Sequence, residues 1–166
     1  MSASVTTAIH PFVEALVAGG QALPASATPW LNRRRAAALE RANALSVPTT
    51  RDEEWKYTDV SPIAKLNFTP VVNHKVNGLT KRDIAPFTFN ELPCHRLVCV
   101  NGHFSKELSS VGTLPEGVRI GSLADAVKNN DEHVKKHLTR YIQYDANAFS
   151  ALGTAFLYDG GYIFVP

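Results

Sequence analysis

Four potential soft-metal ligands, Cys94, His95, Cys99 and His103, lie within one short stretch of the sequence. Thiolate and imidazole groups bind zinc and hold iron–sulfur clusters, so this stretch is the first place to look for chemistry. Its spacing matches no zinc or iron–sulfur pattern, and on a β-strand Cys94 and Cys99 would point to opposite faces. We therefore interpret Cys99, which stands between two valines, as a small apolar residue rather than a ligand.

Three adjacent carboxylates, Asp52, Glu53 and Glu54, could suggest a pair of catalytic acids. Adjacent side chains on one segment point in different directions, and Arg51 and Lys56 stand beside them to neutralise their charge. Negative charge is favourable at the N-terminus of a helix, where it complements the helix dipole. The trio therefore predicts a helix start rather than a catalytic pair.

His133 and His137 have the i, i+4 spacing that lets two imidazoles bind one metal ion on a helix. No third ligand accompanies them, and two lysines lie between them, so we expect a solvent-facing surface. The sequence also lacks a phosphate-binding G-x-x-x-x-G-K-[ST] loop and a nucleophile with a neighbouring base. We therefore expect a protein that is not an enzyme. An enzyme using Cys94 or Cys99 is the alternative, and it requires a thiol with a depressed pKa.

The composition is that of an ordinary globular protein. The 166 residues are 45% hydrophobic and 19% charged, and the formal net charge is +2. The near balance of charge gives no electrostatic reason to expect binding to nucleic acid or to an anionic membrane. No apolar run is long enough to span a bilayer, and the N-terminus lacks the features of a signal peptide. With only two cysteines, we expect a cytoplasmic protein.

Hydrophobic periodicity and turn residues predict an α+β fold. Gly19-Gly20 should end the first helix, Thr28, Ser122 and Asn147 should cap later ones, and Asn101-Gly102 should form a hairpin turn. The expected helices are 4–18, 29–45, 123–128, 131–142 and 147–157, and the expected strands are 94–100, 103–104, 118–120 and 162–165. In the helix 131–142, Val134, Leu138, Tyr141 and Ile142 should face inward.

The second helix carries a run of basic residues. Leu31, Ala38, Ala42 and Leu45 form its apolar face, whereas Arg33, Arg34, Arg35 and Arg41 lie largely elsewhere. A solvated helix face explains the run most simply. The alternative is a small nucleic-acid- or protein-binding module that uses the helix around Arg33–Arg41, and it predicts salt-dependent binding to DNA.

The segment from Pro48 to Ile63 combines a tryptophan, a tyrosine and several charges between prolines. Such a mixture is typical of an ordered junction rather than of a simple helix or strand. We expect Trp55 and Tyr57 to anchor this junction to the helical domain, because each can bury a large apolar area. In the alternative, the two rings form a partner-docking surface with Lys56 as its polar contact.

The apolar strand predicted at 162–165 needs neighbours, yet the sequence ends directly after it. We expect that the chain is truncated and that a larger remainder is missing. The alternative is that this strand pairs with an earlier one such as Leu97–Val100.

Three segments resemble the SufB/SufD family of the SUF iron–sulfur cluster assembly system, and in particular its SufD branch. They are Pro48-Thr-Thr-Arg-Asp-Glu-Glu-Trp-Lys-Tyr-Thr58, Leu97-Val-Cys-Val-Asn-Gly-His-Phe104 and the C-terminal stretch from Phe149 to Pro166. Their order and spacing match over most of the chain.

The resemblance implies an N-terminal helical domain followed by a right-handed parallel β-helix. Residues 1–145 would form the helical α+β domain, and residues 146–166 would begin the β-helix with its first strand. The protein would be a non-catalytic scaffold that acts with SufB and SufC, and the regions that contact them would lie after Pro166. The full complex would handle the iron–sulfur cluster, so the resemblance implies no cofactor on this chain.

Overall fold

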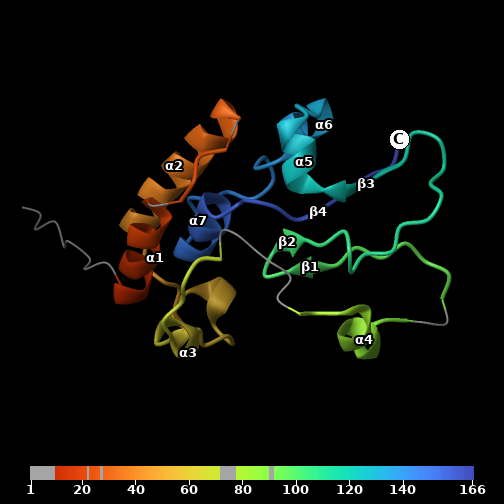
Figure 1. Cartoon of the computed structure of the whole chain (residues 1–166). Coiled ribbons are helices and arrows are strands. Elements are labelled where there is room, and N and C mark those ends of the chain that lie inside the picture. Colours follow the sequence, from red (N-terminus) through yellow and green to blue (C-terminus); the bar gives the residue numbers. More distant parts are fainter. Residues whose placement is uncertain (1–9, 22, 27, 72–77, 90–91) are drawn as a thin grey trace, which may run out of the picture. The chain divides into compact units, whose positions relative to one another are not determined.

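The computed structural model describes residues 10–21, 23–26, 28–71, 78–89 and 92–166 of the chain (Figure 1). These residues form two compact units. The helical unit comprises the chain up to Pro70 together with His137–Leu157, and the hairpin unit comprises Val71–Lys136 together with Tyr158–Pro166. The predicted boundary between residues 145 and 146, where a β-helix would begin, stays a prediction, and the helix after residue 146 packs with the N-terminal helices.

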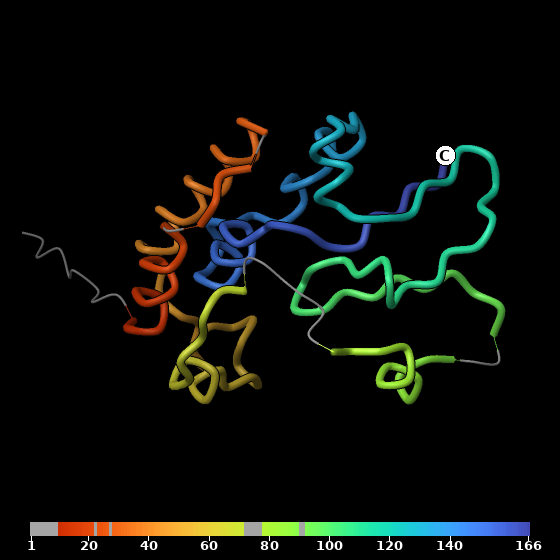
Figure 2. Tube along the Cα trace, viewed as in Figure 1, coloured from red at the N-terminus to blue at the C-terminus, as the bar shows by residue number. Residues whose placement is uncertain are grey.

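The helical unit is built around three helices that are widely separated in sequence. Figure 2 shows α7 lying beside α1 and α2, and all three contribute to one core. Alanines at the contact allow close approach, since Ala38, Ala42, Ala148 and Ala151 are all fully buried. The elements of this unit are α1 (Pro11–Gln21), α2 (Pro29–Ala44), η1 (Glu53–Trp55), α3 (Ser61–Ala64) and α7 (Ala148–Ala155).

The first helix continues through the glycines that were expected to end it. α1 begins at Pro11, where a proline costs no hydrogen bond, and runs to Gln21. A Cβ atom at Gly20 would lie 2.7 Å from a Leu39 methyl carbon, so the missing side chain lets α1 approach α2. The glycines serve helix packing here rather than helix termination. The part of the predicted helix before residue 10 lies outside the described residues.

The second and seventh helices follow the sequence prediction closely. α2 begins at Pro29 after an extended Thr28, although the Thr28 side chain makes no capping hydrogen bond. α7 is capped by Asn147, whose side-chain oxygen accepts a bond from the Ser150 amide at 3.0 Å.

The hairpin unit contains two short antiparallel sheets. Its elements are α4 (Lys81–Ile84), η2 (Ala85–Phe87), β1 (Cys99–Val100), β2 (His103–Phe104), β3 (Arg119–Ser122), α5 (Leu123–Lys128) and β4 (Gly161–Phe164). α6 (Glu132–His137) ends where the chain returns to the helical unit. No helix in the described part of the chain has both the length and the apolar character needed to cross a membrane.

The predicted hairpin turn is confirmed, but its first strand is shorter than expected. Asn101 and Gly102 have φ angles of 49° and 83°, as a tight hairpin turn requires. β1 covers only Cys99–Val100, because the chain before it pairs separately. There Arg96 and Ser110 exchange backbone hydrogen bonds of 2.7 and 2.9 Å as an isolated bridge.

The last strand pairs with β3, in a register that places Arg119 opposite Phe164 and Gly121 opposite Tyr162. The alternative in which this strand pairs with an earlier one is therefore confirmed, although its partner is β3 and not Leu97–Val100. The continuation into a parallel β-helix stays a prediction.

The helix expected at 131–142 is shorter, since α6 ends at His137. Thr139 has a φ of 62°, a left-handed conformation that a helix cannot continue through. Val134 is buried as predicted, whereas Tyr141 and Ile142 are 75% and 66% exposed and not inward-facing. By contrast, α5 has the predicted bounds, and the Ser122 side chain caps it by accepting from the Asp125 amide.

The Asp159 carboxylate joins three elements of the hairpin unit. One oxygen accepts from the Phe104 amide of β2 at 2.8 Å. The other accepts from the Ser122 hydroxyl at 2.8 Å and from the Ala124 amide of α5 at 3.0 Å. Burial raises the pKa of Asp159, but these hydrogen bonds outweigh it and leave the pKa below its ordinary value. A charged carboxylate thus holds β2, the end of β3 and the start of α5 together.

Replacing Asp159 with Asn should lower the stability of the hairpin unit by about 1–3 kcal/mol, because donors on three elements lose their charged acceptor. Hydrogen exchange of the β3 and β4 amides measures this locally. Asp145→Asn, at an exposed position, is the control. Equal protection in the two variants would contradict the role of Asp159.

Candidate functional site

The Trp55 side chain packs against the core of the helical unit. Its ring lies 5.8 Å from the ring of Phe149 on α7, at an interplanar angle of 37°. Upstream, the Asp52 carboxylate accepts hydrogen bonds from the Thr49 amide at 2.7 Å and the Thr49 hydroxyl at 3.1 Å. This closed turn sets the direction of η1 and so directs the indole inward. The acidic trio lies at the start of a short 3-10 helix, as a helix-start interpretation requires.

Tyr57 does not anchor the junction. Its side chain is 91% exposed, so the expectation that it packs on the helical domain is wrong. The Lys56 ammonium lies 5.7 Å from the centre of the Tyr57 ring, within range of a cation–π contact. Lys56 and Tyr57 therefore form an exposed pair, and of the two rings only that of Trp55 contacts the core.

The basic run on α2 does not form one continuous patch. Arg33 and Arg41 are exposed, but Arg35 is 8% exposed and belongs to the buried face. The Arg35 guanidinium donates through Nε at 2.8 Å and Nη2 at 2.5 Å to the Leu157 carbonyl, just after α7. A cation there is favourable because carbonyls at a helix C-terminus carry partial negative charge. Arg35 is thus a packing residue, which removes it from any nucleic-acid surface.

The four potential metal ligands between Cys94 and His103 do not converge on one site. Cys94 and Cys99 are free thiols at exposed positions. The pKa of Cys99 is raised by partial burial and by the negative charge of Asp159, which leaves less thiolate than usual. His95 accepts from the Gly112 amide at 3.1 Å, and His103 bonds the Val71 carbonyl at 2.7 Å.

Within the described ranges, no three Asp, Glu, Cys or His side chains lie close enough together to hold a metal ion. The two histidines at i, i+4 also separate. The His133 ring lies 4.2 Å from the Phe164 ring, whereas His137 Nδ1 bonds the Tyr141 hydroxyl.

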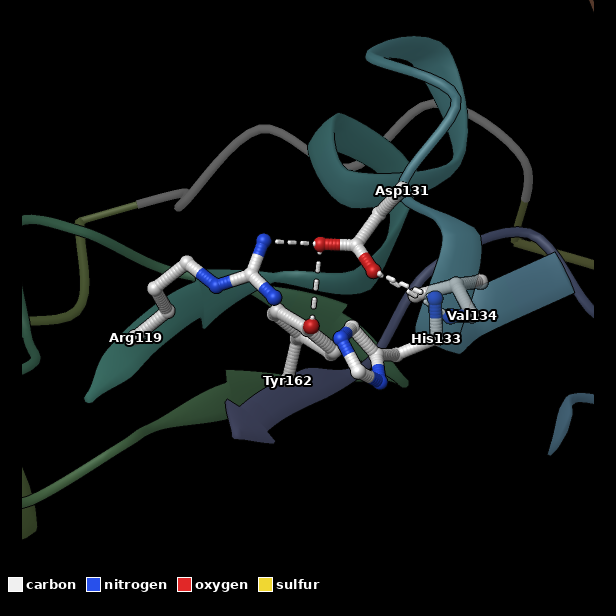
Figure 3. A network of polar contacts seen from close by, with 5 residues as sticks. All are labelled: Arg119, Asp131, His133, Val134 and Tyr162. Carbon is white, nitrogen blue, oxygen red and sulfur yellow. Dashed lines mark hydrogen bonds and ion pairs between the residues drawn. The ribbon is translucent and has the colours of Figure 1, made fainter. Parts of the chain in front are cut away.

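The most connected polar cluster lies on one face of the β3–β4 sheet (Figure 3). Arg119 and Asp131 form an ion pair there, and the Tyr162 hydroxyl donates to Asp131 at 3.0 Å. Tyr162 and Phe164 share a face because they are two apart on a strand. The Arg119 guanidinium lies 4.5 Å from the centre of the Phe164 ring. The sheet register places Arg119 opposite Phe164, and the Asp131 carboxylate reaches Arg119 from the start of α6.

Asp131 is also the residue from which α6 starts. Its second oxygen accepts from the amides of His133 at 2.9 Å and Val134 at 3.3 Å, so it caps the helix. Its side chain is 5% exposed. Burial raises the pKa of Asp131, but the Val134 amide, the Tyr162 hydroxyl and the Arg119 charge together hold it below its ordinary value. Conversely, burial and the nearby carboxylate raise the pKa of Tyr162.

This cluster is suited to holding α6 against the sheet. Both oxygens of Asp131 are occupied by donors, and its pKa is lowered, so it would be a poor proton donor near neutral pH. The sequence places Asp131 at a helix start, but it gives no sign that Arg119 and Tyr162 would reach it. The alternation of Tyr162 and Phe164 on the last strand is the only sequence feature that points toward this face.

The chain matches the family of the SufBD protein N-terminal region over residues 12–166. It belongs to the SufBD family. The resemblance found in the sequence is therefore confirmed at the family level, and the narrower assignment to SufD stays a prediction.

An iron–sulfur cluster assembly SufBD family protein of Synechocystis sp. is similar to this SufBD chain, with 31% identity over 140 residues. The match covers 82% of the chain but 29% of the relative, so the chain spans well under half of that relative's length. No solved structure matches significantly.

Acid should weaken the hairpin unit through Asp131 and Asp159. Their folded-state pKa values are lowered, so the unfolded chain binds more protons in acid. The stabilisation is present above the ordinary carboxyl pKa of about 3.9 and is lost as the pH falls through the folded values. Asp131→Asn should lower stability at neutral pH and flatten its pH dependence, as measured by urea unfolding at a series of pH values. Glu116→Gln, at an exposed position, should leave the pH profile unchanged, and an unchanged profile for Asp131→Asn would contradict the role of the ion pair.

Proposed function

We propose that this chain is the N-terminal scaffold domain of a SufD-type protein that acts in iron–sulfur cluster assembly with SufB and SufC. The observation that carries the proposal is the family match over residues 12–166. The similar Synechocystis protein is itself described as acting in iron–sulfur cluster assembly. The narrower SufD assignment rests on the block from Pro48 to Thr58, which resembles the SufD pattern.

The three resembling segments coincide with elements that take part in the packing or strand pairing inside one unit or the other. The first contains η1 and the inward-facing Trp55, and the second is the β1–β2 hairpin. The third runs from α7, at the centre of the helical unit, to β4. These segments have architectural roles in the structure, which is what a scaffold requires.

A non-catalytic role agrees with how the polar side chains are used. Arg35, Asp131 and Asp159 each use their charge in hydrogen bonds that join structural elements, and the pKa values of the two carboxylates are lowered by these bonds. We therefore propose that the cluster is built by the assembled complex, in the cytoplasm, with this domain contributing structure rather than ligands.

The proposed function is tested by deleting the gene and measuring the activity of an iron–sulfur enzyme in the cells. Activity should fall and should return when the gene is supplied again. An affinity-tagged copy at its native length should co-purify SufB and SufC. Full enzyme activity in the deletion strain together with no co-purified partner would refute the proposal.

Substituting Trp55 with Ala should lower the free energy of unfolding by about 2 kcal/mol, because a half-buried indole leaves the core of the helical unit. Tyr57→Ala should stay within about 0.5 kcal/mol of the original, because its ring is exposed. Urea unfolding measures both variants. Co-purification of SufB and SufC should be unchanged at temperatures where both variants are folded. Loss of the partners without loss of stability in Trp55→Ala would show that Trp55 docks a partner instead.

A further inference from the structure

An apolar groove of about 590 Å³ runs along α7 in the helical unit. Its walls include Trp55, Leu138, Ile142, Phe149 and Leu157. The residues that line it include no Asp, Glu, Lys or Arg. Exposed apolar surfaces of this kind are uncommon on soluble proteins and usually mark a place where something binds.

One end of the groove meets a smaller, acidic hollow of about 260 Å³. Trp55 and Asn147 line both spaces, so the two adjoin. The carboxylates of Asp52, Glu53 and Glu54 line the smaller one. Asp52 is occupied by Thr49, whereas Glu53 and Glu54 are exposed and have no ion-pair partner among the residues that the structure describes. The groove is therefore neutral and apolar along its length and negative at one end.

The exposed rim of the groove makes contacts of its own. Tyr141 bonds His137, and their rings stack with centres 5.8 Å apart at an angle of 20°. The left-handed Thr139 turns the chain between them, and the Tyr141 and Ile142 side chains face solvent at the rim. Apolar side chains that face solvent there add surface that a bound ligand can cover.

We propose that this groove receives an amphipathic helix of a partner protein, whose apolar face fills the groove and whose lysine or arginine end contacts Glu53 and Glu54. Amphipathic helices bind apolar grooves in this manner. The acidic end fixes the direction of the helix, because an uncharged groove alone would accept either orientation. The inference goes beyond the scaffold role, and its failure would leave that role intact, since the resemblance places the SufB and SufC contacts after Pro166.

The probe is a fluorescently labelled synthetic peptide with leucines on one helical face and two lysines at one end. Fluorescence anisotropy with the protein at its native length should show saturable binding. A second peptide with glutamates in place of the lysines should bind at least about tenfold more weakly, since like charges would meet at the acidic end. Replacing both Glu53 and Glu54 with Gln should remove most of that difference.

The position of the site is tested by filling the groove. Gly153 lines it and has open space where a Cβ atom would lie, so Gly153→Gln should fold normally and still block it. The variant should weaken binding at least about tenfold, whereas Gly153→Ala should leave it nearly unchanged. Ile142→Glu should also weaken binding, and Leu66→Glu, on a side chain 58% exposed outside the groove, should not.

Several results would overturn the proposal. They are the absence of saturable binding, equal affinity for the two peptides, and equal losses for Leu66→Glu and Ile142→Glu. Sedimentation of the protein alone provides the remaining check. Self-association that Gly153→Gln abolishes would assign the groove to a second copy of the chain and would overturn the partner helix.

Discussion

The hairpin unit depends on the carboxylate of Asp159. Two-stranded sheets as short as these have little stability of their own, because they form few hydrogen bonds and bury little apolar surface. Asp159 compensates by accepting bonds from β2, from the end of β3 and from the start of α5. Asp131, which follows α5 in the chain, also joins several elements. It caps α6 and contacts Arg119 of β3 and Tyr162 of β4. Two charged side chains thus supply part of the stabilisation that a larger apolar core provides in bigger sheets.

The helical unit is held together by different means. Alanine faces on α2 and α7 allow the helices to approach closely, and Gly20 allows the same between α1 and α2. Small side chains bury little surface each, so the larger residues around them provide much of the apolar contact. Trp55 and Phe149 supply such contact at one end, and the bond from Arg35 to Leu157 closes the other end of α7. The groove lies along this same helix.

The charged side chains of this SufBD-family chain mainly join its structural elements. Residues that looked chemically capable in the sequence turn out to be separated or committed to structural bonds. Cys94 and Cys99 are free thiols, whereas the neighbouring His95 accepts a hydrogen bond from the Gly112 amide. The two carboxylates with lowered pKa values, those of Asp131 and Asp159, hold elements together. An apolar groove along α7 stays open on the surface of the helical unit.

The sequence by itself determined the features that depend on neighbouring residues. The turn at Asn101-Gly102, the caps at Ser122 and Asn147, and the start of α2 at Pro29 were all predictable, because turns and caps are set by local backbone chemistry. The family was also predictable from the segments that resemble it.

Only the tertiary structure decided the features that join distant residues. The bond between Arg35 and Leu157, the pairing of β4 with β3 and the meeting of Arg119 with Asp131 each link segments without a shared periodicity. The exposure of Tyr57 and the early end of α6 were likewise decided by tertiary packing. An aromatic residue, or apolar residues at helical spacing, favours burial. The sequence does not say whether another part of the chain lies there to bury them. Local backbone preferences determine which helices, strands and turns form. Burial and charge pairing between distant segments determine which side chains become part of the core.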